Sequence, residues 1–333
     1  MVCHSDLMKS KAFGVLIFVF NVRLVVKFLV ARRKFPSLAV PITIDDKYLW
    51  RKIFDHNPLF VTLSDKLLTK KYLAEHHPAV GFAKVLWRGI DIMTAPQDLL
   101  RSAGFLKANH ASGFNIRLGS SPPDMQQLQR QTRKWLQTRW EKYHGEWGYA
   151  GVHPQLFIEE DLNAGATATL TDFTVYVFGQ EISHFVAMHG HKSESILVAR
   201  FDGRGKRMTR PRVGESNILP PDGTGRTVTC SVLPADYVLP AGTDAMLETA
   251  RRIAAGHDHL RVDFLSNGNG FFLTEITLYP MGGYIIYEDE DLPRLMTSCW
   301  DLRGSWFLNT RQTGWRGRYA RWLQRQLEPH AVT

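Results

Sequence analysis

Cysteine is scarce in this chain of 333 residues. It has three, Cys3, Cys230 and Cys299, and no two of them have the CxxC spacing. Three scattered thiols exclude a disulfide framework and favour a reducing, cytosolic compartment. His189 and His191 stand without a nearby cysteine or an HExxH pattern, which disfavours a zinc site there.

Acidic charge is nearly missing from the N-terminal segment. Residues 1–34 carry seven basic groups and one acid, so +6 of the net charge of +9 belongs to them. The remaining 299 residues carry only +3, which argues against a basic nucleic-acid groove. The hydrophobic content of 44% and the mean hydropathy of -0.20 are typical of a soluble protein with a sizeable core.

A long uninterrupted apolar run is also missing. The run Phe13–Phe20 is too short to span a bilayer, and its extension brings in Asn21, Arg23 and Lys27. No small-residue cleavage site follows it, so a secretory signal is disfavoured. We expect a basic amphipathic helix with peripheral membrane contact through residues 12–34. The alternatives are a helix packed on the body of the protein and an unstructured extension.

Strands and helices alternate along the rest of the chain. The segments TIDDKYLWRKIFDHNPLF and SDKLLTKKYLAEHH predict helices, with a cap at Ser64 or Asp65. GFLKANHASGFNIRL predicts two strands joined by a small-residue loop, and QLFIEEDL predicts another strand. The mixed order predicts an α+β enzyme fold with antiparallel sheets.

The stretch HLRVDFLSNGNGFFLTEITLYPMGG, from His259 to Gly283, predicts a β-hairpin whose NGNG turn supplies positive-φ residues. Side chains alternate along a strand, so the apolar residues of the two strands are expected to share one side. Matching them sets four cross-strand pairs: Val262–Ile276, Phe264–Thr274, Asp263–Glu275 and Arg261–Thr277.

This register places two carboxylates, those of Asp263 and Glu275, directly opposite each other. Facing carboxylates repel, so either one is protonated or a cation lies between them. Oxygen ligands of this kind suit Mg²⁺ bound together with substrate phosphates. The alternative is a solvated surface on which Arg261 neutralises the pair.

Lys107 is a candidate phosphate contact for such a site. It lies in an otherwise apolar strand before the loop His110–Gly113, and small-residue loops let backbone N–H groups approach phosphates. The segment matches neither a P-loop nor GxGxxG, so a surface lysine at a strand edge is the alternative.

Five segments, taken in order, resemble the TupA-like group of ATP-grasp enzymes, which is associated with bacterial cell-surface polysaccharide and polypeptide synthesis. They are SDKLLTKKYL, FLKANHASG, QLFIEEDL, LRVDF and LTEITLYPMGG, and the resemblance covers about residues 45 to 300. It implies two α+β lobes that clasp Mg²⁺ and ATP. It divides the chain into a basic N-terminal segment (1–44), an N-terminal lobe (45–95), a lid lobe (96–160) and a C-terminal lobe with the hairpin (161–333).

The resemblance also implies roles for individual residues. Phosphate contacts would come from Lys107 and from Lys84 or Arg88, with His110, Ser112 and Gly113 in a mobile lid. Glu159, Glu160 and Leu162 would meet adenine and ribose. Asp263, Glu275 and Thr277 would hold Mg²⁺. Arg261 would face the phosphate or acyl-phosphate end and share the catalytic role with Lys107.

Two positions depart from the expected pattern. Thr277 stands where the wider superfamily has Asn, and Thr174 stands where a Lys is expected. The implied activity is ATP-dependent joining of a carboxylate and an amine through an acyl phosphate, in a cytoplasmic enzyme, with a surface glycan precursor among the candidate substrates. A non-catalytic nucleotide- or glycan-binding accessory protein, supported by Thr174, and a kinase on the same fold are the alternatives.

Overall fold

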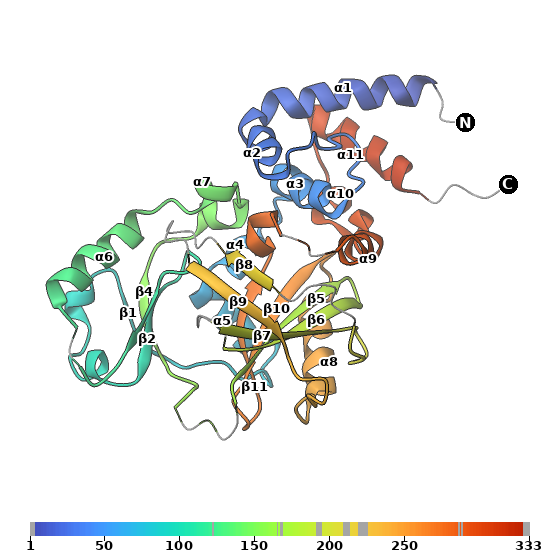
Figure 1. Cartoon of the computed structure of the whole chain (residues 1–333). Coiled ribbons are helices and arrows are strands. Elements are labelled where there is room, and N and C mark those ends of the chain that lie inside the picture. The colour runs from blue at the N-terminus through green and yellow to red at the C-terminus, as the bar shows by residue number, and fades with distance from the viewer. Residues whose placement is uncertain are drawn as a thin grey trace.

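The structure is a computed structural model that describes residues 4–121, 123–164, 166, 169–190, 195–208, 214–218, 226–285, 287 and 289–328. Figure 1 shows a smaller sheet with α6 and α7 on one side of the molecule and a larger sheet with α8 on the other. A cluster of helices from both ends of the chain lies above the larger sheet.

The helices and strands alternate along the chain as the sequence predicts. The α-helices of the described residues are α1 (His4–Phe20), α2 (Val22–Arg32), α3 (Ile44–Phe54), α4 (Leu59–Ser64), α5 (Lys66–His76), α6 (Met125–Gln137), α7 (Glu141–His144), α8 (Thr243–Ala254), α9 (Asp291–Cys299), α10 (Trp306–Asn309) and α11 (Gly314–Leu327). The strands are β1 (Val85–Gly89), β2 (Gly104–Ala108), β3 (Asn115–Leu118), β4 (Leu156–Glu160), β5 (Thr171–Phe178), β6 (Glu181–His189), β7 (Ser195–Phe201), β8 (Gly214–Ile218), β9 (Arg226–Val232), β10 (Leu260–Ser266) and β11 (Phe271–Thr277).

The strands form two separate sheets. The smaller has the order β1-β4-β2-β3, with antiparallel neighbours throughout. The larger has the order β11-β10-β5-β6-β7-β9-β8, in which β7 and β9 are parallel and the other neighbours antiparallel. The predicted fold class, α+β with two lobes of mixed and antiparallel sheets, is confirmed.

The small sheet packs one side on α6. Leu106 and Ala108 of β2 and Leu156 and Ile158 of β4 join Trp135 of α6 in one apolar core. Side chains of a strand alternate between its two sides. Lys107 of β2 and Glu159 of β4 therefore point away from this core. The lobe division predicted from the sequence stays a prediction, although the sheet takes β1 from residues 85–89 and its other strands from 104–160.

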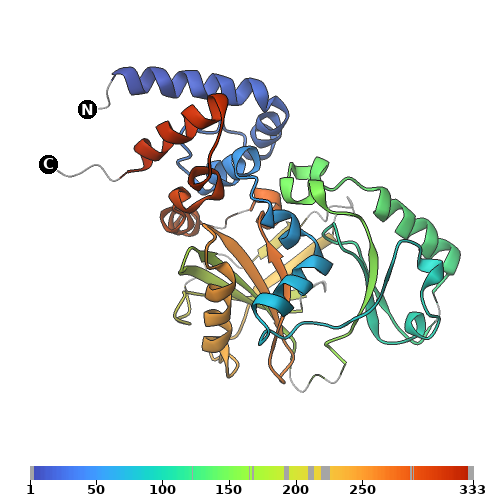
Figure 2. The ribbon, with the colours of Figure 1, turned by 180° about the vertical axis from the view of Figure 1, so that it is seen from behind.

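The large sheet packs one side on α8. Leu260, Val262 and Phe264 of β10 are buried with Met246 and Ile253 of α8 in the largest apolar core. Alternation turns Arg261 and Asp263 to the opposite side of the sheet. Figure 2 shows α4 and α5, in blue, between this sheet and the small one.

Both ends of the chain meet in the helical cluster. Its core unites Ile17, Val25 and Phe28 of the N-terminal helices with residues of α3, such as Tyr48, and of α11, such as Trp322. The N-terminal helices therefore pack on the body of the protein, which excludes an unstructured extension. The membrane contact expected of residues 12–34 stays a prediction.

The N-terminal segment forms two helices, where the sequence suggested one. Asn21 interrupts the run, because its side-chain amide donates to the carbonyl of Ile17 at 2.9 Å. The helical parts Asp6–Phe20 and Val22–Arg32 are bent by 97°. Within the described residues no single helix meets the length and hydropathy criteria for a membrane span, and only this bent pair meets them when taken together.

Candidate functional site

The β10–β11 hairpin has most of the predicted register. Three of its cross-strand pairs are confirmed, namely Val262–Ile276, Asp263–Glu275 and Arg261–Thr277. The turn residues Gly268 and Gly270 have φ values of 88° and 146°, as the NGNG prediction requires. The hairpin thus brings the two carboxylates to the same side of the sheet.

The predicted pair Phe264–Thr274 is wrong. Phe264 faces Leu273, and the register shifts between Asp263 and Phe264. The shift buries Leu273 in the core and leaves Thr274 as the extra residue of a β-bulge, whose hydroxyl donates to the carbonyl of Asp263 at 3.2 Å. Burying the side chain of Leu273 is more favourable than burying that of Thr274, and this difference explains the bulge.

Each hairpin carboxylate has a cationic partner. Arg261 binds Asp263 with Nε at 2.8 Å from Oδ1 and Nη2 at 2.5 Å from Oδ2. Lys66 of α5 lies with Nζ at 3.5 Å from Oε1 of Glu275. Two different cations therefore offset the repulsion that the register predicts, and Arg261 neutralises only one of the two carboxylates.

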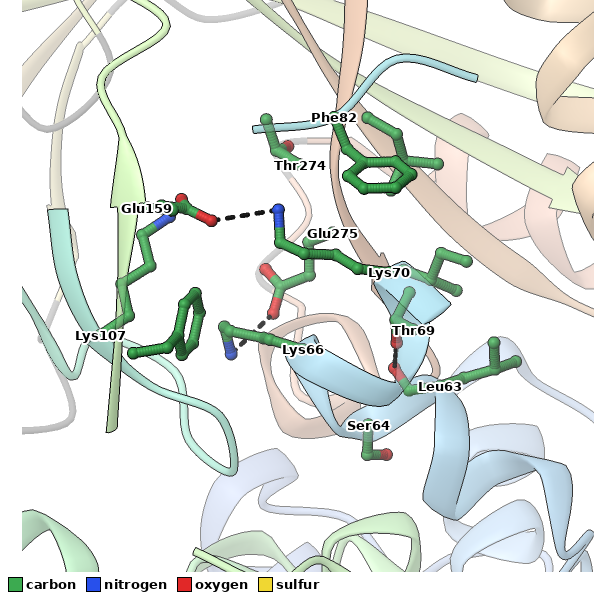
Figure 3. A pocket seen from close by; sticks show the side chains of 13 residues that line it. Leu63, Ser64, Lys66, Thr69, Lys70, Phe82, Lys107, Glu159, Thr274 and Glu275 are labelled. Atoms are coloured by element: carbon green, nitrogen blue, oxygen red, sulfur yellow. Dashed lines mark hydrogen bonds and ion pairs between the residues drawn. The ribbon is translucent and has the colours of Figure 1, made fainter. Parts of the chain in front are cut away.

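A cleft opens between the two sheets next to Glu275. It encloses about 420 Å³ of space that is partly open to solvent. Its walls come from α4 and α5, from Phe82, from Lys107 and Glu159 of the small sheet, and from residues 273–276 of β11. Figure 3 shows the charged side chains of both walls pointing into this space.

Three lysines meet two glutamates in the cleft. Lys70 lies 3.1 Å from Glu159, and Lys107 makes a short ion pair with the same carboxylate. Lys66, one helical turn before Lys70, pairs with Glu275 and donates to the carbonyl of Ala111 at 2.6 Å. Three ammonium groups against two carboxylates leave a positive excess, which favours an anionic ligand.

Burial and two neighbouring lysines shift the pKa of Glu159 in opposite directions. Burial alone would raise its pKa, but the ammonium groups of Lys107 and Lys70 lower it, and the net direction is below the usual value. Burial lowers the pKa of Lys70, and Glu159 opposes that shift. Glu159 is therefore a carboxylate anion that holds two lysines in place.

Helix α5 is positioned by its N-terminal cap. Asp65 accepts hydrogen bonds from the backbone N–H groups of Leu67 and Leu68, at 2.8 and 3.2 Å. Its second carboxylate oxygen accepts from Asn109 at 2.9 Å, and Asn109 also donates to the carbonyl of His153 at 3.0 Å. The cap thus fixes Lys66 and Lys70 relative to the strand of Lys107.

Lys66 and Lys70 were not among the residues proposed from the sequence. SDKLLTKKYL carried the resemblance, yet no site role was assigned to its lysines. The available signal was a capping Asp followed by two lysines spaced i and i+4, which lie on one side of a helix. Only the packing of α5 between the sheets shows what that side contacts.

Several predicted nucleotide contacts lie at the margin of the cleft or outside its lining. Lys84 has an exposed side chain, and its backbone pairs with Glu160 through bonds of 2.8 and 3.0 Å. The carbonyl of Leu162 accepts from Asn267 of the hairpin turn at 2.9 Å. Arg88 is exposed on β1. The nucleotide roles of these residues stay predictions.

The predicted lid is only partly exposed. His110 is 3% exposed and donates from Nε2 to the carbonyl of Trp135 at 3.0 Å. Ser112 and Gly113 are exposed, and Gly113 has a φ of 76°. His110 therefore anchors the loop on α6, and any lid movement would involve the two residues after Ala111.

The hairpin residues fit a magnesium ion. Asp263 and Glu275 face each other, and Oγ1 of Thr277 is buried without a hydrogen-bond partner in the part of the chain that the structure describes. That part holds no group of three His, Cys, Asp or Glu side chains placed as metal ligands. Two carboxylates and a free hydroxyl match an ion that takes its other ligands from water and phosphates.

A polar surface extends from the hairpin across the large sheet. Thr174 of β5 lies opposite Asp263, and Tyr176 lies opposite Arg261. Tyr176 stacks on His184 with ring centroids 4.3 Å apart, and burial followed by Arg200 lowers the pKa of His184 to about 3. The imidazole of His184 is therefore neutral and packed against Tyr176. Of the two histidines considered for zinc, His189 lies at the end of β6 and His191 lies outside the described residues.

Solved structures with a related architecture include two D-alanine–D-alanine ligases. The Helicobacter pylori enzyme has 12% sequence identity and a TM-score of 0.41, covering 71% of this chain and 61% of its own. The Bacillus anthracis enzyme has 12% identity and a TM-score of 0.35, covering 65% and 57%. This chain thus spans about three fifths of the length of those two enzymes.

The ATP-grasp ligase PsnB, solved with a minimal precursor, Mg and ADP, has 9% identity and a TM-score of 0.36, covering 85% of this chain and 66% of its own. Likeness at this level says nothing of substrate or activity. No protein-family model and no curated protein matches the chain.

Proposed function

We propose that this chain is a Mg²⁺- and ATP-dependent carboxylate–amine ligase of the ATP-grasp type, related to the TupA-like group. The observation that supports it most is the facing pair of Asp263 and Glu275 beside a cleft with excess positive charge. Such a cleft suits a polyphosphate, and the pair suits the metal that accompanies it.

The residues can be given roles in this chemistry. A carboxylate is a poor electrophile, so ATP first converts it to an acyl phosphate, and an amine then displaces phosphate. Mg²⁺ supplies charge neutralisation at the transferring phosphoryl group. Lys107 and Lys70 lie where they can contact the nucleotide phosphates, and Arg261 can contact the acyl-phosphate end.

The ion pairs of the cleft explain how the ligand-free site is stabilised. Arg261 and Lys66 hold Asp263 and Glu275, the same two carboxylates that would bind the metal. Arg261 and Lys66 would contact phosphate oxygens when Asp263 and Glu275 hold the metal in place of these pairs. The site would thus exchange internal ion pairs for ligand contacts, which limits the desolvation cost of binding.

Replacing Lys70 by Gln is expected to weaken Mg·ATP binding about 10- to 100-fold, because a charge-assisted hydrogen bond contributes roughly 1.5–3 kcal/mol. Calorimetric titration measures the change. Lys71→Gln is the matched control, since the Lys71 side chain is 71% exposed and lies 3.9 Å from Glu75. Equal affinities of the two variants would contradict the role of Lys70.

Trapping the acyl phosphate tests the ligase proposal. Wild-type protein with ATP, Mg²⁺ and hydroxylamine should convert candidate carboxylates, beginning with acidic sugars and amino acids, to hydroxamates with release of ADP. Mass spectrometry of the products separates the three activities considered. ADP release without any hydroxamate or amide, but with a phosphorylated product, would indicate a kinase.

An accessory protein without catalysis is the second candidate. Thr174 supports it, because it lies directly opposite Asp263, where the expected lysine would add a cation beside the metal pair. Nucleotide binding with no ADP release across the carboxylates and amines tested would favour this candidate over the ligase. Acceptor-stimulated ADP release would exclude it.

We further propose that the substrates belong to cell-envelope polysaccharide or polypeptide synthesis and that the enzyme works on the cytoplasmic side. The support is the resemblance of the five quoted segments, together with the low cysteine content. Neighbouring glycosyltransferase and export genes would agree with this setting. Neighbours confined to an unrelated pathway would contradict it.

A further inference from the structure

Exposed apolar side chains concentrate on the N-terminal helices. Of the seventeen large apolar side chains that are exposed in the described residues, ten lie between residues 7 and 42. Such a concentration marks an interaction surface, whereas single exposed apolar residues are normal on any protein. Helices α1 and α2 lie at the outer edge of the helical cluster (Figure 1).

Helix α1 is apolar on two opposite sides. Its inner side is covered, because Ile17 is fully buried and the ring of Phe13 lies 5.3 Å from Tyr319 and 5.2 Å from Trp322 of α11. Its outer side carries Val15 and Val19, which are 63% and 59% exposed. A helix that is apolar all round is normally buried on all sides, so the outer side lacks its cover.

Helix α2 repeats this arrangement. Its inner side buries Val25 and Phe28, at 0% and 1% exposure. Its outer side presents Val22, Val26 and Val30 at a spacing of four residues, and Val30 is 76% exposed. We call Met8, Val15, Val19, Val22, Val26 and Val30 the outer apolar surface.

The basic side chains beside the outer apolar surface indicate which partner binds there. Lys9 and Lys11 lie on either side of the exposed stripe of α1, and Arg33 and Lys34 follow α2. Lys9 lies 3.8 Å from Asp6 and Lys34 lies 3.3 Å from Asp45, but both lysine side chains remain about half exposed, at 52% and 48%. Asp6 is the one acid among the first 34 residues. In a symmetric dimer the basic side chains around this surface would meet those of the second copy and repel them, whereas anionic lipid headgroups would attract them.

We propose that α1 and α2 lie on an anionic membrane surface, with the outer apolar surface in the acyl-chain boundary and the basic side chains at the headgroups. The 97° bend and the packing of α1 on α11 keep both helices at the surface. The proposal requires no nucleotide and is independent of the ligase activity, so either can fail without the other.

Vesicle cosedimentation tests the proposal. At about 0.15 M salt, the full chain should bind phosphatidylglycerol–phosphatidylcholine vesicles and leave pure phosphatidylcholine vesicles unbound. The double variant Val19→Glu/Val30→Glu should bind the anionic vesicles more than about tenfold more weakly. Val238→Glu, at a valine that is 81% exposed on another part of the molecule, should bind as the wild type does.

Three results would overturn the proposal. They are a wild-type chain that does not bind anionic vesicles, equal binding to both vesicle types, and equal binding by the double variant. Light scattering adds a fourth: a wild-type dimer that the double variant converts to a monomer would assign the surface to a second copy. Circular dichroism and thermal unfolding check that the variants are folded, as substitutions at exposed positions should be.

Discussion

Glu275→Gln and Asp263→Asn are each expected to lower the rate of ATP turnover by at least about a hundredfold. Each removes one of the two carboxylates that face each other across the hairpin and fit Mg²⁺. Metal stabilisation of a transferring phosphoryl group contributes several kcal/mol, and about 3 kcal/mol corresponds to two orders of magnitude. ADP release at saturating Mg·ATP measures the effect.

The control for these variants is Glu248→Gln, which neutralises a glutamate on α8 whose side chain is 58% exposed. Its turnover should match that of the wild type. Extra Mg²⁺ should restore part of the activity of Glu275→Gln, because the remaining carboxylate still binds the ion weakly. Turnover by Asp263→Asn at the wild-type rate would remove the hairpin from the site.

Arg51→Met is expected to lower the free energy of unfolding by about 3–5 kcal/mol, because it leaves a buried carboxylate without its cation. Arg51 is fully buried and lies 2.6 Å from Asp258. It also donates to the carbonyls of His259, just before β10, and Leu278, just after β11, at 3.0 and 3.1 Å. Arg51 thus holds together the open end of the hairpin.

Urea unfolding measures this loss, with Arg303→Met as the control. Arg303 also pairs with an aspartate, Asp301, at 2.6 Å, but both side chains are about half exposed, at 47% and 51%. An exposed pair contributes at most about 1 kcal/mol. Similar midpoints for the two variants would show that the buried network does not stabilise the fold.

The hairpin shows what a sequence pattern can predict at a site. Alternation and the NGNG turn were enough to place Asp263 opposite Glu275 and Arg261 opposite Thr277. The bulge at Thr274 could not be predicted, because it results from competition between a regular ladder and the burial of Leu273. That competition depends on the core under the sheet, which no local pattern describes.

The cationic partners of the site could not be predicted from local sequence patterns for another reason. Lys66 and Glu275 are 209 positions apart in the sequence and meet only because α5 packs between the sheets. Arg51 lies in α3, a helix that buries four charged side chains, those of Asp45, Asp46, Arg51 and Lys52. Pairing makes such burial tolerable: Arg32 and Lys34 pair with Asp45, and Asp258, 207 positions away, pairs with Arg51.

A crystal structure of the chain with Mg²⁺ and ADP tests the central claim most directly. We expect a metal between the carboxylates of Asp263 and Glu275 at about 2.0–2.1 Å, with the phosphates against Lys70 and Lys107. Lys66 should then have left Glu275. Nucleotide bound away from the cleft, with the Arg261–Asp263 and Lys66–Glu275 pairs unchanged, would contradict the account.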